Sequence, residues 1–181
     1  MRIISGEHKG RRINPPAVFS ARPTTDFARE ALFNILVNRI DFENTDVLDL
    51  FSGTGSISYE FASRGARSVH LVEKDIKHFS FIRKMITDLK FERIKPFHGD
   101  VRLFLKICKS DFDIIFADPP YDLEWLEMIP ELVISSGLLK EDGFFILEHP
   151  RDLSFSSNKY FFEHRNYGSV NFSFFRLNKE V

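Results

Sequence analysis

Four short segments of the sequence carry acidic side chains, glycines or prolines that are suited to holding a small ligand. They are residues 49–55, Glu73, residues 99–100 and residues 118–121, and each follows a run of residues typical of a strand. In a parallel sheet the carboxyl ends of the strands share one edge, and ligands bind outside that edge. The order of these segments therefore predicts one binding site built from four loops.

The segment Asp-Leu-Phe-Ser-Gly-Thr-Gly at residues 49–55 predicts a close approach between backbone and ligand. Gly53 and Gly55 lack side chains and precede a predicted helix. The pattern differs from a dinucleotide-binding fingerprint because Ser58 stands at the third glycine position. The Asp49 carboxylate repels phosphate and suits a cation, so the segment favours S-adenosylmethionine with its ammonium and sulfonium groups. A purely structural strand-to-helix turn is the alternative.

Glu73 and Asp100 are candidates for binding the nucleoside part of such a ligand. Glu73 ends a predicted strand 24 residues after Asp49, and an acidic residue at about this spacing binds ribose hydroxyls in dinucleotide sites. Asp100 can accept a hydrogen bond from an adenine amino group. Both have structural alternatives: Glu73 as a cap of the helix that starts near Asp75, and Asp100 as the N-cap of a helix over residues 101–108.

The Asp-Pro-Pro-Tyr segment at residues 118–121 indicates the type of reaction. Pro119 and Pro120 fix the backbone, so the Asp118 carboxylate and the Pro119 carbonyl are expected to be fixed acceptors for one amino group. Two such bonds hold the nitrogen with its lone pair toward a methyl sulfonium, which favours in-line methyl transfer. Tyr121 is expected to stack on a planar base or amide, with a role as core filler as the alternative.

The periodicity of apolar residues predicts the elements that position these segments. Helices are predicted at residues 26–39, 56–64, 75–89, 101–108 and 123–135, and strands at 46–50, 68–73, 94–98, 112–118, 143–149, 160–165 and 170–177. Their alternation predicts an α/β fold with a doubly wound, mostly parallel seven-stranded sheet. The last two strands have no helix between them, which predicts an antiparallel C-terminal strand. The chain is interpreted as one domain, residues 1–181, with an N-terminal arm at 1–25 before the α/β part at 26–181.

Composition excludes several classes of protein. The 181-residue chain holds one cysteine, Cys108, which excludes a disulfide scaffold and a cysteine-rich zinc site; we expect a small buried thiol. The six histidines are scattered, so no metal site is predicted. No apolar run approaches membrane-spanning length and the first residues lack a signal-peptide pattern, so a cytoplasmic protein is expected. The 21 phenylalanines are interpreted as core residues.

The charge is unevenly distributed along the chain, although the net charge is only −1. Residues 1–22 hold five Lys and Arg residues against Glu7 alone, a local charge of +4. Such an arm suits contact with nucleic-acid phosphates. A solvated, charged terminus is the alternative, because the isoelectric point near 6.6 is low for a nucleic-acid-binding chain.

Taken together, Asp-x-Phe-x-Gly-x-Gly from Asp49, Glu73, Asp100 and Asp-Pro-Pro-Tyr resemble class I S-adenosylmethionine-dependent amino methyltransferases. The N-terminal part narrows this to a resemblance to the RsmD family. It is carried by Arg-Ile-Ile-Ser-Gly at 2–6, Gly-Arg-Arg at 10–12, Arg-Pro-Thr-Thr-Asp at 22–26 and Arg-Glu-Ala-Leu-Phe-Asn-Ile-Leu at 29–36. The resemblance extends from residue 1 to about 150. Enzymes of that family methylate the N2 amine of one guanine in bacterial 16S rRNA.

The resemblance implies a role for each matching residue and a partner for the chain. The residues expected to bind S-adenosylmethionine are Asp49, Phe51, Gly53, Gly55, Glu73, Lys74, Asp100, Val101, Thr24 and Thr25. The expected catalytic residues around the target amine are Asp118, Pro119, Pro120 and Tyr121, and those expected to contact RNA are Lys9, Arg11, Arg12 and Arg22. The implied partner is 16S rRNA within the small ribosomal subunit or its assembly intermediate, and the protein is expected to be a monomer.

Three other functions are compatible with parts of the sequence. An adenine-N6 DNA methyltransferase shares Asp-Pro-Pro-Tyr, but 181 residues leave no room for the usual target-recognition region. In protein glutamine methyltransferases Asn commonly replaces Asp118. A non-catalytic cofactor-binding or ribosome-assembly module has no need for the Asp118 carboxylate.

Overall fold

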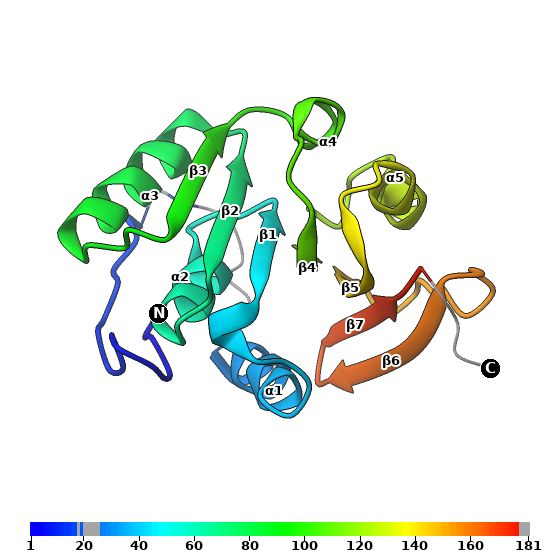
Figure 1. Ribbon diagram of the computed structural model, residues 1–181, viewed down its shortest axis with the longest axis horizontal. Helices are drawn as coiled ribbons and strands as arrows, with labels where there is room; N and C mark the ends of the chain where they lie inside the picture. The colour runs from blue at the N-terminus through cyan, green and yellow to red at the C-terminus, as the bar shows by residue number, and fades with distance from the viewer. Residues whose placement is uncertain (18, 20–25, 178–181) are drawn as a thin grey trace.

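The computed structural model describes residues 1–17, 19 and 26–177, and its centre is one seven-stranded sheet (Figure 1). The strands are β1 (Asp46–Leu50), β2 (Ser68–Glu73), β3 (Ile94–His98), β4 (Phe112–Ala117), β5 (Leu139–His149), β6 (Phe161–Tyr167) and β7 (Val170–Phe175). Their order is β3-β2-β1-β4-β5-β7-β6; β1 to β5 run parallel, and β7 is antiparallel to β5 and to β6. The predicted doubly wound, mostly parallel sheet with an antiparallel C-terminal strand is confirmed.

Helices cover both faces of the sheet because the strands alternate their apolar side chains between two hydrophobic clusters. One face carries α1 (Asp26–Leu36), α2 (Ser56–Ser63) and α3 (Ile76–Asp88), and the other carries α4 (Val101–Ile107) and α5 (Ile129–Ser135) (Figure 1). Within β1, Val47 belongs to the first cluster and Leu48 to the second, as expected for side chains that alternate along a strand. In the described ranges, no helix is long and apolar enough to cross a bilayer.

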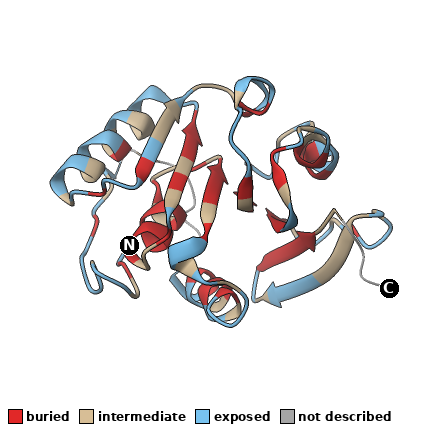
Figure 2. Ribbon diagram, viewed as in Figure 1, coloured by how far each residue is buried: buried red, intermediate tan, exposed pale blue. Residues whose placement is uncertain are grey.

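The central strands are buried along almost their whole length (Figure 2). Most phenylalanines belong to this core, including Phe61 on α2 and Phe116, Phe145 and Phe172 in the sheet. In the described part of the chain, Phe27 is the one phenylalanine among the exposed large hydrophobic side chains. The interpretation of the phenylalanines as core residues is confirmed.

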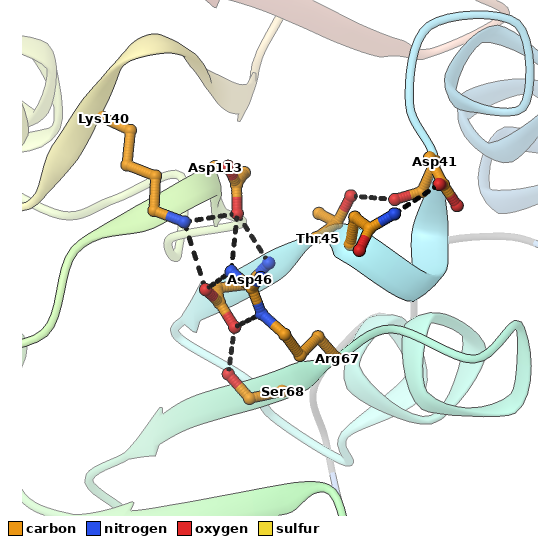
Figure 3. A network of polar contacts seen from close by, with 8 residues as sticks. Asp41, Thr45, Asp46, Arg67, Ser68, Asp113 and Lys140 are labelled. Carbon is orange, nitrogen blue, oxygen red and sulfur yellow. Dashed lines mark hydrogen bonds and ion pairs between the residues drawn. The ribbon is translucent and has the colours of Figure 1, made fainter.

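A cluster of ion pairs joins the amino-terminal ends of four strands, at the edge opposite the predicted site (Figure 3). The Asp46 carboxylate accepts hydrogen bonds from the Arg67 guanidinium, from the Ser68 hydroxyl at 2.8 Å and from Lys140 Nζ at 3.1 Å. Lys140 Nζ also donates to Asp113 Oδ2 at 2.8 Å. The bonds from Arg67 are the main reason why the pKa of Asp46 lies well below its ordinary value.

The N-terminal arm is fixed to the fold over residues 1–13. The Glu60 carboxylate on α2 accepts hydrogen bonds from the backbone N–H groups of residues 4 and 5, at 2.8 and 3.1 Å. At the end of α2, the Ser63 hydroxyl accepts from the N–H of residue 8 and donates to the carbonyl of residue 5. Ile3 and Ile13 are buried in the core. These contacts turn a charged terminal segment into an ordered part of the surface.

The prediction of one helix over residues 123–135 is wrong in its first half. The 3-10 helix η2 (Leu126–Met128) precedes α5, and Trp125 has φ of −111°, outside the helical range. Pro130 lies in the first turn of α5, where its missing N–H breaks no helical bond. A helix that began at residue 123 would place this proline in its interior, so the helix begins at Ile129.

Several other predicted bounds move by a few residues. α1 ends at residue 36 rather than 39, β4 at 117, and β5 begins at 139 with an irregular register opposite residues 112–114. The final strands cover 161–167 and 170–175, which shortens the predicted turn to two residues. A short 3-10 helix, η1 (Phe42–Asn44), precedes β1. The prediction of a buried Cys108 is also wrong, because this residue caps the end of α4 with extended backbone angles and is half-buried.

Candidate active site

A cavity of about 1140 Å³ lies at the carboxyl ends of the parallel strands. Its lining includes residues from all four predicted segments: Gly53 after β1, Glu73 at the end of β2, Asp100 after β3 and Asp118 after β4. The lining extends further to Glu148 at the end of β5. The structure therefore brings together side chains that are widely separated in the sequence, as the strand order predicts.

The loop after β1 needs unusual backbone angles. Phe51, Gly53 and Gly55 have φ of 63°, 54° and 84°, in the left-handed region that side chains with a Cβ disfavour. A Cβ added to Gly55 would lie 2.6 Å from Cζ of the buried Tyr59 ring, whereas one added to Gly53 would meet nothing within 4 Å. Gly55 is thus required by packing, and Gly53 borders open space in the cavity.

Asp49 lies behind this loop rather than in the cavity wall. Its side chain is buried, and Oδ2 accepts a hydrogen bond of 2.5 Å from the Ser58 hydroxyl on α2. Burial, and then the nearby Asp118 and Glu73 carboxylates, raise the pKa of Asp49 to about 7. Like Gly55, Asp49 is not one of the residues that line the cavity. Its predicted role at the methionine part of the cofactor stays a prediction.

Glu73 joins the loop after β1 to the start of α3. Its Oε2 accepts from the Gly53 N–H and its Oε1 from the Asp75 N–H, both at 2.7 Å. Burial raises the pKa of Glu73. The alternative in which Glu73 caps α3 is wrong, because Asp75 is the N-cap and accepts from the N–H groups of Lys77 and His78. Glu73 instead fixes the glycine loop and also lines the cavity.

Asp100 caps α4 and also lies in the cavity wall, while its predicted contact with adenine stays a prediction. It is the N-cap of α4, where Oδ1 accepts from the Arg102 N–H at 2.9 Å, and it also lines the cavity beside Val101 and Lys74. Lys74 Nζ is 3.5 Å from Asp100 Oδ2. Partial burial acts to raise the pKa of Asp100, but the hydrogen bonds from Arg102 and the nearby Lys74 charge outweigh it and lower the pKa.

The Asp-Pro-Pro-Tyr segment forms the middle of the cavity wall. Asp118 is half-buried, Pro119 is buried, and Tyr121 exposes 43% of its surface while lining the cavity. Such exposure rules out the alternative in which Tyr121 fills the core. The Tyr121 hydroxyl donates a hydrogen bond of 3.3 Å to Glu148 Oε1. The ring thus stays available at the cavity while its hydroxyl is held.

Glu148 and Trp125 are among the lining residues that the sequence reasoning missed. Glu148 is buried at the end of β5, although the same rule that selected Glu73 and Asp118 applies to it. The signal was an acidic residue directly after the apolar run of β5. Trp125 also lines the cavity, with the Arg102 guanidinium 5.1 Å from its ring centre. Its position depends on the loop between β4 and α5, which the sequence predicted as helix.

The predicted RNA-contacting residues are separate from the cavity lining. Lys9, Arg11 and Arg12 are exposed on the ordered arm and are not among the lining residues. Arg22, Thr24 and Thr25 lie outside the described residues, so their predicted roles stay predictions. The cavity wall includes the carboxylates of Glu73, Asp75, Asp100, Asp118 and Glu148, which suit a cationic ligand and a polar amine.

Comparison with known proteins places these features in a family. The sequence pattern of the family described as Conserved hypothetical protein 95 matches residues 1–176. The chain belongs to this family. The match covers both the arm and the site, and it confirms the resemblance inferred from the N-terminal and Asp-Pro-Pro-Tyr motifs.

Relatives of the chain carry informative names. It is 32% identical over 148 residues to Ribosomal RNA small subunit methyltransferase D of Escherichia coli (strain K12), covering 82% of this chain and 74% of that protein. The protein of the same name from Buchnera aphidicola subsp. Baizongia pistaciae is 32% identical over 154 residues, covering 85% and 78%. The family therefore includes proteins named as rRNA methyltransferases.

Solved structures agree with the fold. A hypothetical protein from Thermus thermophilus superposes with a TM-score of 0.85 at 29% identity, covering 98% of this chain and 99% of that one. Precorrin-6y C5,15-methyltransferase from Geobacter metallireducens shares only the fold, with a TM-score of 0.64 at 15% identity, over 85% of this chain and 90% of that one. The seven-stranded sheet with antiparallel β7 is the class I methyltransferase fold.

Proposed function

We propose that this protein transfers a methyl group from S-adenosylmethionine to the N2 amine of a guanine in 16S rRNA. The observation that carries the proposal is the meeting of Glu73, Asp100 and Asp118 in one cavity, with the Asp-Pro-Pro-Tyr segment in its middle. The names of the rRNA methyltransferase relatives support the substrate class. The proposal treats residues 1–181 as one catalytic unit.

The residues present fit S-adenosylmethionine. Gly53 leaves open space where a Cβ would stand, which allows a ligand close to the backbone. Glu73 and Asp100 would hold the ribose and the adenine, with Lys74 and Val101 beside them. The buried Asp49 carboxyl lies behind the glycine loop, where a bound cationic amino acid group would favour its charged form. When bound, this cofactor supplies a methyl group on a positively charged sulfonium.

Asp118 and Pro119 would orient the target amine. The Asp118 carboxylate and the Pro119 carbonyl accept its two N–H groups, which withdraws the nitrogen lone pair from conjugation with the ring. Held in this way, the nitrogen would present its lone pair to the methyl group that the bound cofactor would supply. Asp118 would accept the proton that the nitrogen loses. Tyr121 holds the base by stacking.

Replacing Asp118 tests this mechanism. Asp118→Ala should bind S-adenosylmethionine within a few-fold of the wild type, measured by calorimetry, while methyl transfer to small subunits disappears. Asp122→Ala is a matched control, because Asp122 is a nearby exposed carboxylate outside the cavity lining. Undiminished turnover by Asp118→Ala would exclude the proposed role.

The ordered arm would contact RNA phosphates. Lys9, Arg11 and Arg12 are exposed on a segment whose backbone is held by Glu60 and Ser63. Such fixed cations can bind phosphate without ordering a flexible tail, which lowers the entropic cost of binding. Together with Arg22, they would contact RNA outside the cavity.

Charge reversal tests the arm. Arg11→Glu with Arg12→Glu should raise the KM for RNA and flatten its dependence on salt, because fewer counterions are released on binding. Lys109→Glu is the control, since this exposed lysine follows α4 at the end away from Asp100. An unchanged KM and salt slope in the double variant would remove the arm from the RNA interface.

A further inference from the structure

Glu148 is a buried carboxylate that the proposed chemistry leaves without a role. It is the penultimate residue of β5, is 4% exposed and lines the same cavity as Asp118. Along β5 its side chain alternates with Leu147 and shares a face with Ile146, whose cluster packs under α1 and α2. Burial of a carboxylate is costly unless polar partners meet it, and a donor on a bound ligand would add to the hydrogen bond that Glu148 accepts from Tyr121.

The cavity continues past the residues assigned to the cofactor. Ser169, in the turn between β6 and β7, and Val170, the first residue of β7, both belong to its lining together with Tyr121 and Glu148. The cavity volume of about 1140 Å³ exceeds the range of roughly 300–1,000 Å³ typical of sites for one small ligand. The end of β5 and the C-terminal hairpin thus contribute a further part of the cavity wall, which we call the second compartment. Because β4 and β5 pair at Ala117 and Leu147, Glu148 on β5 lies beside Asp118, which follows β4.

We infer that Glu148 selects guanine by accepting a hydrogen bond from its N1–H group. This inference rests on the proposed function. Guanine presents two neighbouring donors, N1–H and the N2 amine, whereas adenine presents the acceptor N1 beside its amine. When the N2 amine is bound at Asp118, the neighbouring N1–H group of guanine would face the second compartment, which Glu148 lines. A carboxylate only accepts hydrogen bonds, so it attracts N1–H and repels a bare N1.

Tyr121 fixes the carboxylate that performs this selection. Its hydroxyl donates to Glu148 Oε1 at 3.3 Å, so one residue stacks on the base and also orients the group that reads its edge. This arrangement couples the position of the aromatic ring to that of the acceptor. Ser169 and Val170 close the compartment on the side of the hairpin.

The test compares two bases at the methylated position. The 16S rRNA is assembled by ligation with either guanosine or 2-aminopurine riboside at the nucleotide that the wild-type enzyme methylates. Each RNA is then incorporated into small subunits. The base 2-aminopurine keeps the target amine but carries an unprotonated N1. The wild-type kcat/KM for 2-aminopurine should be roughly 10- to 100-fold below that for guanosine, as expected for one lost charged hydrogen bond.

Variants separate selection from a structural role. Glu148→Gln should bring the two kcat/KM values to within about three-fold of each other, because its amide can donate to the unprotonated N1. Tyr121→Phe removes the hydroxyl that orients the carboxylate but leaves the carboxylate itself, so it should reduce the preference for guanosine less than Glu148→Gln does. If Glu148 were purely structural, both variants would lower the two values equally and leave their ratio unchanged.

The possible results distinguish the role of Glu148 from the proposed function. Equal wild-type rates on the two bases, or an unchanged ratio in Glu148→Gln, would overturn the role of Glu148 while leaving guanine methylation intact. The wild-type comparison needs no variant, so the test holds even if Glu148→Gln does not fold. Failure of the wild type to label guanosine at all would instead overturn the proposed function.

Discussion

The buried Asp49 should make the stability of the protein depend on pH in an unusual direction. Its pKa rises from an ordinary value of 3.8 to about 7 in the folded chain. The folded state therefore keeps the proton that the unfolded state loses above pH 4. Between pH 4 and pH 7 this group lowers the free energy of unfolding as pH rises, and above pH 7 the cost stays constant.

The magnitude follows from the two pKa values. The difference between the folded and unfolded pKa values of Asp49 corresponds to about 4 kcal/mol of destabilisation above pH 7. About 2.5 kcal/mol of this develops between pH 5 and pH 8. Asp49→Asn removes the titration but keeps the shape of the side chain and an oxygen that can accept from the Ser58 hydroxyl. The variant should therefore gain stability relative to the wild type as pH rises.

Urea unfolding at a series of pH values measures this effect. The difference in unfolding free energy between Asp49→Asn and the wild type should grow by about 2.5 kcal/mol from pH 5 to pH 8. Asp111→Asn is a control, since Asp111 is exposed and its substitution should leave the pH profile unchanged. Parallel profiles for Asp49→Asn and the wild type would refute the reasoning, because Asp49 would then ionise equally in both states.

Four further substitutions test the fold at the ion-pair cluster of Asp46 and around the loop after β1. Asp46→Asn weakens the bonds to Arg67 and Lys140 and should cost about 1 to 3 kcal/mol at pH 7. Because the pKa of Asp46 is lowered by folding, its contribution is present above the unfolded pKa and is lost as pH falls toward the folded one; the variant's deficit should shrink in acid unfolding measurements. Gly55→Ala should cost about 2 to 4 kcal/mol in urea unfolding, from its left-handed φ and the clash with Tyr59. Gly53→Ala, with similar strain but no clash, should cost about 1 kcal/mol, and equal losses would refute the packing argument. Tyr59→Phe should be neutral or stabilise by up to about 1 kcal/mol in thermal unfolding, because the buried hydroxyl has no partner among the described residues; a loss above 1 kcal/mol would show that it is bonded.

Much of the site was predictable because strand order alone determines which loops meet. Glu73, Asp100 and Asp118 all line one cavity, as expected for residues that follow successive parallel strands. Glu148 obeys the same rule and was overlooked because it falls within the predicted strand 143–149 rather than in the loop after it. The periodicity of apolar residues could not predict that Asp49 is buried behind the loop instead of lining the cavity. Its burial depends on contact with Ser58 on α2.

The remaining differences have tertiary causes. The arm is ordered because Glu60, in the middle of α2, meets backbone N–H groups some 55 residues earlier, and no local pattern encodes that pairing. The start of α5 was placed too early because apolar spacing from Leu123 fits a helix, while Pro130 permits one only from Ile129. The half-burial of Cys108 follows from the end of α4, and helix ends are less well specified by sequence than helix centres.

The identity of the methylated group tests the central proposal most directly. The protein is incubated with tritiated-methyl S-adenosylmethionine and either undermethylated small subunits, free rRNA or duplex DNA, and the labelled nucleoside is identified after digestion. We predict N2-methylguanosine from 16S rRNA, with the ratio of subunit to free RNA naming the form that is recognised. Label in N6-methyladenine or in protein would contradict the proposed target while leaving the fold and the family unchanged.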